Sequence, residues 1–266
     1  VVVEENTLQV HVSSLRKLLG PGYIATVHGR GYKYVGPMPQ SMVAETMASV
    51  RPSDKGNVPD YRQECIAREE ELASLATLLG KHRITSIVGP GGVGKTTLAI
   101  EAAARQPGFF DGGVWLVDLA PVGDPAHVAS TIGQTLGMLT RKSTSIENEL
   151  AEYLRAEELL LVLDNCEHLL GTVSEVLKVL LARAPRVKVL ATSQVPLGLP
   201  EEHVFKLATF KLPEPGEDWQ ASQAGRFFRH CYESHGETIG GAERDTVSRL
   251  CRNLDGFAGG RVAAHA

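Results

Sequence analysis

The sequence predicts an α/β fold with a parallel β-sheet over most of its length. Beyond residue 60, short apolar segments alternate with longer amphipathic ones, which is the order of strands and helices in a parallel sheet. A glycine-rich segment stands between the first apolar segment and the helix expected after it. A chain of 266 residues that are 43% hydrophobic and 22% charged can bury a sizeable core, which excludes wholesale disorder.

Apolar spacing predicts the individual elements of this region. Spacings of three and four residues, as among Leu72, Leu75 and Leu79, put apolar side chains on one side of a helix, whereas short continuous apolar runs are typical of buried strands. In chain order, the patterns predict a helix over residues 69–79, a strand over 84–88, a helix over 97–105, a strand over 114–119, helices over 126–139 and 146–155, a strand over 159–163, a helix over 173–184 and a strand over 187–192. Two further helices are expected over 221–233 and 242–254.

Charge and composition divide the chain. The formal net charge is −4, but residues 1–36 carry four basic and two acidic residues, so this segment is positive and the remainder is more strongly negative. Residues 37–60 have prolines near both ends and no apolar period, which is typical of a linker. We therefore expect a first domain over 1–36, a linker over 37–60, an α/β domain over 61–212 and the start of a helical domain over 213–266.

Several classes of protein are excluded by the sequence. The longest aliphatic run, residues 159–163, is far shorter than the ~20 residues of a membrane span. Four scattered cysteines, without CxxC or histidine-paired spacing, argue against a disulfide scaffold or a zinc site. The first residues lack the features of a signal peptide. We expect a cytoplasmic protein that does not bind membranes.

The glycine-rich segment fits the phosphate-binding pattern G-x-x-x-x-G-K-[ST] between a strand and a helix, so the predicted fold is that of a P-loop NTPase. Glycines without a Cβ let successive N–H groups converge on phosphate oxygens, and the helix after them adds its positive end. Lys95 is expected to bridge the β- and γ-phosphates, and the hydroxyl of Thr96 to bind Mg²⁺. The residues predicted to bind nucleotide in this segment are Gly89, Pro90, Gly91, Gly92, Val93, Gly94, Lys95, Thr96 and Thr97.

A P-loop also requires an acidic residue at the end of a second buried strand. Asp164 directly follows the apolar run 159–163 and is the predicted second residue of the Mg²⁺ site. The next residue is Asn165, whose amide cannot act as a general base, so hydrolysis should be slow. Glu167 can orient water, or it is simply an acid in the first turn of a short helix. We name Lys95, Asp164 and Glu167 as candidate catalytic residues.

The segments IAREEELASLATLL, IVGPGGVGKTTLAIEAA, GGVWLVDLAPVGDP, LLLVLDNCEHLL and VLATSQVPLGLP resemble the STAND class of signalling ATPases, close to the NB-ARC and AP-ATPase group. The resemblance covers about half of the chain, residues 66–198. It implies that ATP or ADP with Mg²⁺ is held between the P-loop domain and a helical domain. It also puts Ile66, Ala67 and Arg68 near the adenine, although the family usually has glycine in place of Ala67.

The chain departs from this family at two places. The family commonly ends its fourth strand in Thr-Ser-Arg, with the arginine near the γ-phosphate, whereas here Gln194 follows Thr192 and Ser193. Gln194 is therefore the predicted nucleotide contact at this point. Whether this uncharged side chain distinguishes ATP from ADP through the γ-phosphate is left open by the sequence. The Gly-Leu-Pro-Leu-Ala-Ile turn of the helical domain is replaced by Gly256-Phe257-Ala258-Gly259-Gly260 and the residues after it, so we expect residues 257–266 to be divergent or out of frame.

The first segment contains an amphipathic helix and a hairpin. Residues 6–19 place Leu8, Val12, Leu15 and Leu19 in one narrow arc, and strands over 23–27 and 32–35 flank a turn. A helix and a hairpin of this kind are structural in most proteins. The sequence LQVHVSSLRKLLG followed by IATVHGRGYKYVGP nevertheless resembles the end of the OmpR/PhoB-type winged-helix domain, which binds double-stranded DNA with a recognition helix and a wing.

Through this second resemblance, the predicted DNA-binding residues are Asn6, Val10, His11, Ser13, Ser14 and Arg16 on the recognition helix and Thr26, His28 and Arg30 in the wing. Only the end of the winged-helix (α+β) domain is present, so we expect the sequence to be a fragment of a longer regulator.

The sequence thus predicts a transcriptional regulator that binds DNA through its first domain and uses an ATP- or ADP-binding domain as a switch, with self-association between copies. Two alternatives remain open. One is an ATP-hydrolysing or phosphoryl-transferring enzyme with an accessory first fold; the other is a signalling scaffold that assembles on ATP binding and does not bind DNA.

Overall fold

The computed structural model of the chain describes residues 24–27, 31–34, 56–58, 65–106, 109–138, 145–213 and 218–234. The chain divides into two compact units, residues 1–52 and residues 53–266. In the first unit, β1 (Ile24–Val27) and β2 (Gly31–Tyr34) form an antiparallel pair in which Ile24 is opposite Tyr34. The hairpin predicted from the sequence is confirmed. The helix expected over residues 6–19 lies outside the described residues.

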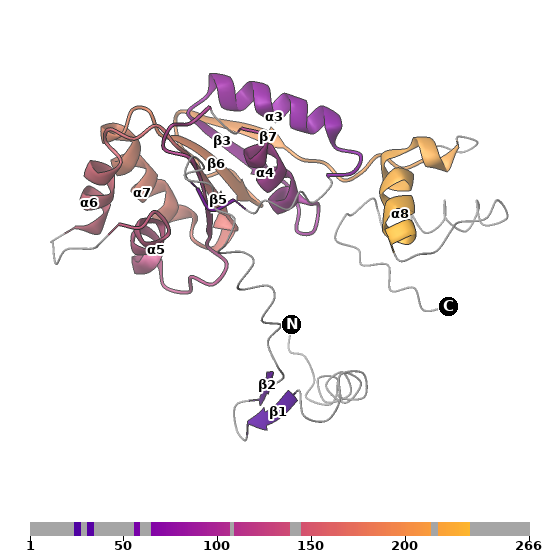
Figure 1. The fold of residues 1–266 in the computed structure, drawn as a ribbon, viewed down its shortest axis with the longest axis horizontal. Helices are drawn as coiled ribbons and strands as arrows, with labels where there is room; N and C mark the ends of the chain where they lie inside the picture. The colour runs from indigo at the N-terminus through magenta and orange to yellow at the C-terminus, as the bar shows by residue number, and fades with distance from the viewer. Residues whose placement is uncertain are drawn as a thin grey trace. The chain divides into compact units, whose positions relative to one another are not determined.

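The second unit is an α/β structure with one sheet (Figure 1). Its elements, in chain order, are α3 (Glu69–Lys81), β3 (Ile84–Val88), α4 (Lys95–Ala104), β4 (Val114–Asp118), η1 (Pro125–His127), α5 (Val128–Thr135), α6 (Ile146–Tyr153), β5 (Leu160–Asp164), η2 (Cys166–His168), α7 (Leu170–Arg183), β6 (Lys188–Ser193), β7 (Glu202–Lys206), η3 (Trp219–Ala221) and α8 (Gln223–Ser234). Most lie within a few residues of the elements predicted from the sequence.

The five strands are parallel and lie in the order β4-β5-β6-β3-β7. The chain leaves β3, crosses to the edge strand β4, and returns through β5 and β6 to the side of β3. Parallel strands all end at one edge of the sheet, and a ligand site lies where the strand order reverses. That edge carries the segments after β3, β4, β5 and β6.

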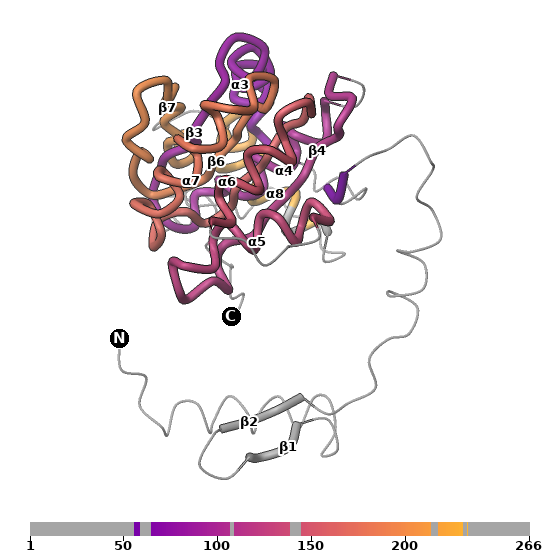
Figure 2. The backbone as a smooth tube through the Cα atoms, turned by 90° about the vertical axis from the view of Figure 1, so that its left-hand side faces the viewer, coloured from indigo at the N-terminus to yellow at the C-terminus, as the bar shows by residue number. Residues whose placement is uncertain are grey.

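Helices cover both faces of the sheet (Figures 1 and 2). Its strands are accordingly apolar on both sides. On one face, Leu161 and Leu163 of β5 pack in a buried cluster with residues of α5, α6 and α7. On the other face, Leu160 and Val162 of the same strand pack with residues of α3 and α4. The alternation of side chains along one strand therefore builds two separate halves of the core.

The structure corrects the sequence prediction in three places. Strand β7 was not predicted. The helix expected over residues 126–139 is a turn of 3₁₀-helix, η1, followed by the shorter helix α5; Asp124 accepts a hydrogen bond from the N–H of Ala126 at the start of η1. Asp164 is the last residue of β5 and does not follow the strand. The helix expected over residues 242–254 lies outside the described residues.

Part of the segment predicted as a linker contacts the sheet. Gly56 forms a parallel bridge with Val114, and the side chain of Asn57 accepts from the N–H of Leu116 at 2.6 Å and donates to its carbonyl at 2.8 Å. Residues 56–58 thus extend the edge of the sheet beside β4. Among the residues that the structure describes, no helix is long and apolar enough to cross a membrane.

Candidate functional site

The glycine-rich loop joins β3 to α4 at the edge where the strands end. Gly94 precedes the first residue of α4 with φ +94°, a left-handed conformation that side chains with a Cβ rarely adopt. A Cβ on Gly89 would come within 2.5 Å of the carbonyl oxygen of Leu207, after β7. The loop can follow this path only with glycine at these positions, and the path leaves its backbone N–H groups and the start of α4 at the same edge.

Lys95, the first residue of α4, is 8% exposed. Its Nζ donates to the carbonyl oxygens of Gly89 and Pro90, each at 3.0 Å. These two hydrogen bonds hold the ammonium group against the loop that precedes α4. The aliphatic part of the Lys95 side chain is buried. This places a fixed positive charge at the loop, as a phosphate site requires.

Thr96 and Asp164 meet at this edge. Thr96 Oγ1 donates to Asp164 Oδ1 at 2.8 Å, and Thr192, near the end of β6, donates its hydroxyl to the same oxygen. Asp164 is only 4% exposed, and a buried carboxylate requires such donors. The adjacent hydroxyl and carboxylate oxygens are the ligands that Mg²⁺ prefers, so the two side chains fit the metal that the P-loop pattern implies.

Asp118, which the sequence analysis did not single out, lies beside Asp164. The two residues are opposite each other in the pairing of β4 with β5. The amide of Asn165 joins them, because its Nδ2 donates to Asp164 Oδ2 at 2.9 Å and to Asp118 Oδ1 at 3.2 Å. Asn165 has φ +61°, a left-handed conformation that asparagine tolerates better than most residues. An acidic residue at the end of the strand that precedes the strand of Asp164, the predicted Mg²⁺ residue, was the signal that could have identified Asp118.

Glu167 and Gln194, predicted separately, contact each other. Gln194 Nε2 donates to Glu167 Oε1 at 3.2 Å, from the end of β6 to η2. Glu167 Oε2 is buried and has no hydrogen-bond partner among the described residues. Glu167 does stand in the first turn of a short helix, as the alternative interpretation of the sequence predicted.

The segment ahead of α3 is held tightly. Ala67 is 1% exposed and has φ +60°, so an alanine occupies a left-handed position that favours glycine. This geometry explains why a glycine would suit the position. Ala67 packs in a buried cluster with Phe210, Trp219 and Phe228, so the segment lies against residues that follow β7.

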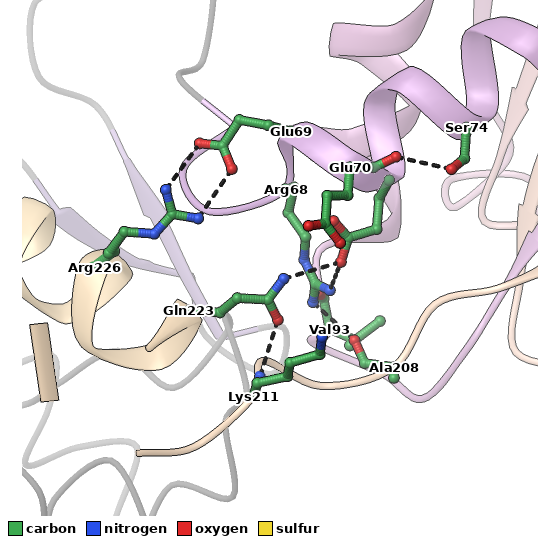
Figure 3. Close-up of polar contacts among 10 residues, drawn as sticks. Arg68, Glu69, Glu70, Ser74, Val93, Ala208, Lys211, Gln223 and Arg226 are labelled. Carbon is green, nitrogen blue, oxygen red and sulfur yellow. Dashed lines mark hydrogen bonds and ion pairs between the residues drawn. The ribbon is translucent and has the colours of Figure 1, made fainter. Parts of the chain in front are cut away.

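Arg68 is buried at 4% exposure and its guanidinium joins several segments (Figure 3). Nη1 pairs with Glu71 Oε1 at 2.7 Å, and Nη2 donates to the carbonyl oxygen of Ala208 at 2.8 Å and to that of Val93, in the P-loop, at 3.5 Å. Its Cζ lies 4.1 Å from the centre of the Phe210 ring. The guanidinium of Arg68, which was predicted to lie near the adenine, therefore binds groups of the protein itself.

The predicted DNA-binding residues cannot be located in the same detail. Thr26 lies in β1, of which only the backbone is described. The others, Asn6, Val10, His11, Ser13, Ser14, Arg16, His28 and Arg30, lie outside the described residues.

Two family models match the chain. Residues 69–195 match the NB-ARC domain, and residues 1–34 match the C-terminal domain of transcriptional regulatory proteins. An HTH-type transcriptional regulator of Mycobacterium tuberculosis is 32% identical over 194 residues, which are 71% of this chain and 21% of that protein. An uncharacterized protein of the same organism is 31% identical over 191 residues, 72% of this chain and 47% of its own length. The chain thus spans between a fifth and a half of these curated relatives.

Solved structures are similar at a lower level. A STAND protein with a tetratricopeptide repeat sensor from Pyrococcus horikoshii is 15% identical with a TM-score of 0.47, over 70% of this chain and 28% of that one. A Walker-type ATPase of Pyrococcus abyssi is 21% identical with a TM-score of 0.45, over 76% of this chain and 67% of that one. The sequence matches thus place an NB-ARC domain over residues 69–195 of the chain, with a segment similar to the C-terminal domain of transcriptional regulatory proteins ahead of it.

Proposed function

We propose that the chain is part of a transcriptional regulator in which bound ATP or ADP controls binding to double-stranded DNA. The observation that carries this proposal is the meeting of Lys95, Thr96 and Asp164 at one edge of the sheet, in a chain whose first residues match a DNA-binding domain. The order of the two matches also supports it, because a DNA-binding domain and a nucleotide domain in one chain can act as output and switch.

In this proposal the P-loop backbone, Lys95 and Thr97 bind the nucleotide phosphates. Thr96 and Asp164 hold Mg²⁺, which neutralises charge on the phosphates when it is bound. Ile66 and Arg68 position the base side of the site, Arg68 through its contacts with the loop and with the segment after β7. Gln194 and Glu167 form a polar pair at the ends of β6 and β5 on the same edge.

The nucleotide acts as a switch, with slow hydrolysis. The residue after Asp164 is an asparagine whose amide is bound by two carboxylates, so it supplies no base for an attacking water. Glu167 is the remaining candidate for orienting water, and its Oε1 is bound by Gln194. A site of this composition favours a long-lived bound nucleotide over rapid turnover.

The DNA-binding part of the proposal rests on the first unit. Arg16, Arg30 and the polar residues of the predicted recognition helix would contact phosphates and base edges, with the β1–β2 hairpin as the wing. The nucleotide state would set how copies of the regulator associate on DNA. A protein that binds chromosomal DNA in a bacterium works in the cytoplasm.

The proposal is tested with the complete regulator that contains these residues, bound to duplex DNA from upstream of its own gene. We expect binding that weakens with salt and on Arg16→Ala, and that differs between ADP and ATP in the presence of Mg²⁺. The same DNA affinity with either nucleotide, despite nucleotide binding, contradicts the switch. Binding of nucleotide without binding of any duplex favours the scaffold alternative.

A further inference from the structure

The buried charge of Arg68 joins three parts of the chain: α3, the P-loop and the segment after β7. A buried guanidinium is stable only when its donors are satisfied, and those of Arg68 go to Glu71 in α3, to Val93 in the P-loop and to Ala208 after β7. Phe210 covers its face. If any of these groups shifts, the guanidinium has to follow it or lose a partner in a water-poor site. A shift of the P-loop backbone at Val93 therefore moves the guanidinium and alters its ion pair with Glu71.

Glu71 also contacts α8. Gln223, the first residue of α8, donates from Nε2 to Glu71 Oε1 at 3.4 Å. Its Oε1 accepts from the N–H of Lys211 at 3.0 Å (Figure 3). Glu71 Oε1 thus accepts from Arg68 and Gln223 together. The start of α8 is linked to the P-loop through two side chains, Glu71 and Arg68.

An apolar contact accompanies this polar link. Trp219, which is 2% exposed, and Phe228 of α8 pack in one cluster with Ala67, the residue before Arg68. The turn η3 and α8 therefore contact the segment ahead of α3 on both its polar and its apolar side. Movement of α8 changes the environment of Trp219.

The junction contains two buried polar atoms without a hydrogen-bond partner among the described residues. They are Glu71 Oε2 and Trp219 Nε1, and both lie where α8 and η3 meet the segment around Arg68. An unsatisfied buried polar atom costs stability, and its presence in a native structure calls for an explanation. Either a bound water or a shift of α8 can supply these atoms with partners.

A second link between the same elements provides a contrast. Arg226 of α8 pairs with Glu69 of α3 at 3.0 Å, with side chains that are 39% and 63% exposed. An exposed pair of this kind contributes little, because water screens it. Among the described residues, no side-chain hydrogen bond joins this pair to the P-loop.

We propose that Arg68, Glu71 and Gln223 form a relay that couples the nucleotide state of the P-loop to the position of α8. The inference rests on the proposed function, since it requires that the P-loop binds nucleotide. Arg68 and Gln223 act in it as positioning residues: Arg68 responds to the carbonyl of Val93, and Gln223 carries the change to α8.

The chain contains two tryptophans, which makes the relay measurable. Trp115 lies in β4, where its Nε1 donates to the carbonyl of Gly112, and Trp115→Phe leaves Trp219 as the single reporter. In this background, tryptophan emission is followed while ADP or ATP is added with Mg²⁺, and nucleotide affinity is measured separately by calorimetry. The variants are Gln223→Ala, Arg68→Lys and, as the matched control, Arg226→Ala.

We expect nucleotide to change Trp219 emission in the parent and in Arg226→Ala. We expect Gln223→Ala to lose at least about half of that change while it still binds ADP, because the link to α8 is cut and the P-loop is intact. Arg68→Lys should lose the change as well, since an ammonium cannot bond the carboxylate and both carbonyls in one plane.

Full emission changes in Gln223→Ala overturn the relay, whatever Arg68→Lys does. Emission that does not respond in the parent, although calorimetry shows nucleotide binding, overturns it too. Absence of nucleotide binding in the parent contradicts the proposed function instead, so the two failures are distinguishable.

Discussion

Thr96 Oγ1 donates to Asp164 Oδ1 at 2.8 Å, although the two residues are 68 positions apart in the chain. They meet because β3 and β5 are parallel strands of one sheet, so the loop after β3 and the end of β5 lie at the same edge. The hydroxyl and the carboxylate that we propose hold Mg²⁺ are thus already in contact.

The hydroxyl of residue 96 should control the Mg²⁺ dependence of nucleotide binding. Thr96→Ala removes the proposed metal ligand and should weaken ATP binding with Mg²⁺ about tenfold, the loss of one favourable interaction, whereas Thr96→Ser keeps the hydroxyl and most of the affinity. Titration of ATP with and without Mg²⁺ measures the difference. Equal affinities for the alanine and serine variants would show that the hydroxyl does not bind the metal.

Asn165→Asp should lower stability at neutral pH. The substitution replaces an amide that donates to Asp118 and Asp164 with a third carboxylate beside them. Like charges raise the pKa of one carboxyl in the folded state, so the variant should be about 1–3 kcal/mol less stable near pH 7 and should recover as the pH falls and that carboxyl is protonated. Urea unfolding at several pH values tests this, with the wild-type chain as control. A constant difference between the two chains across the pH range contradicts the prediction.

Cys166 should resist alkylation in the folded protein. Burial, together with the nearby carboxylates of Asp164 and Glu167, raises the pKa of its thiol to about 12, and burial raises that of Cys65 to about 11. Since the thiolate is the reactive form, neither cysteine should react with iodoacetamide at pH 8 until the chain unfolds. Peptide mass spectrometry with and without urea measures this. Rapid labelling of Cys166 without urea would mean that the strand end is open to solvent.

The Glu69–Arg226 pair should stabilise α8 only above acidic pH. The hydrogen bond to its own backbone N–H and the pairing with Arg226 lower the pKa of Glu69, so its contribution is present at neutral pH and is lost as the pH falls through the lowered value. Because both side chains are partly exposed, Arg226→Ala should cost at most about 1 kcal/mol at pH 7. Thermal unfolding of the two chains at pH 7 and at pH 3 makes the comparison. A larger cost at pH 3 contradicts the assignment.

The parts of the site that depend on local sequence could be predicted. The P-loop pattern fixes its own conformation through glycines such as Gly94, and the parallel order of strands brings Asp164 to the loop. Strand β7 was missed because Glu202–Lys206 mixes charged and apolar residues and has no continuous apolar run. It joins the sheet by pairing with β3, a contact between distant segments.

Other features arise only from tertiary contacts. Arg68 follows an apolar residue and precedes three glutamates, so its sequence context suits an exposed helix end, yet it is buried by Val93, Ala208 and Phe210. Ala208 is 140 positions away in the chain. Asp118 was overlooked because it falls inside the strand predicted over residues 114–119 and belongs to no recognised motif. Its position opposite Asp164 follows from the register of β4 and β5.

Every other proposal depends on the binding of ATP or ADP with Mg²⁺ by Gly89–Thr96 and Asp164. Calorimetric titration of the chain with ADP and Mg²⁺, beside Lys95→Ala and the control Lys178→Ala on α7, tests it most directly. We predict one nucleotide per chain, with affinity reduced roughly tenfold to a hundredfold in Lys95→Ala, the loss of a hydrogen bond between charged groups, and unchanged in Lys178→Ala. No binding by the folded wild-type chain, or equal binding by Lys95→Ala, would contradict it.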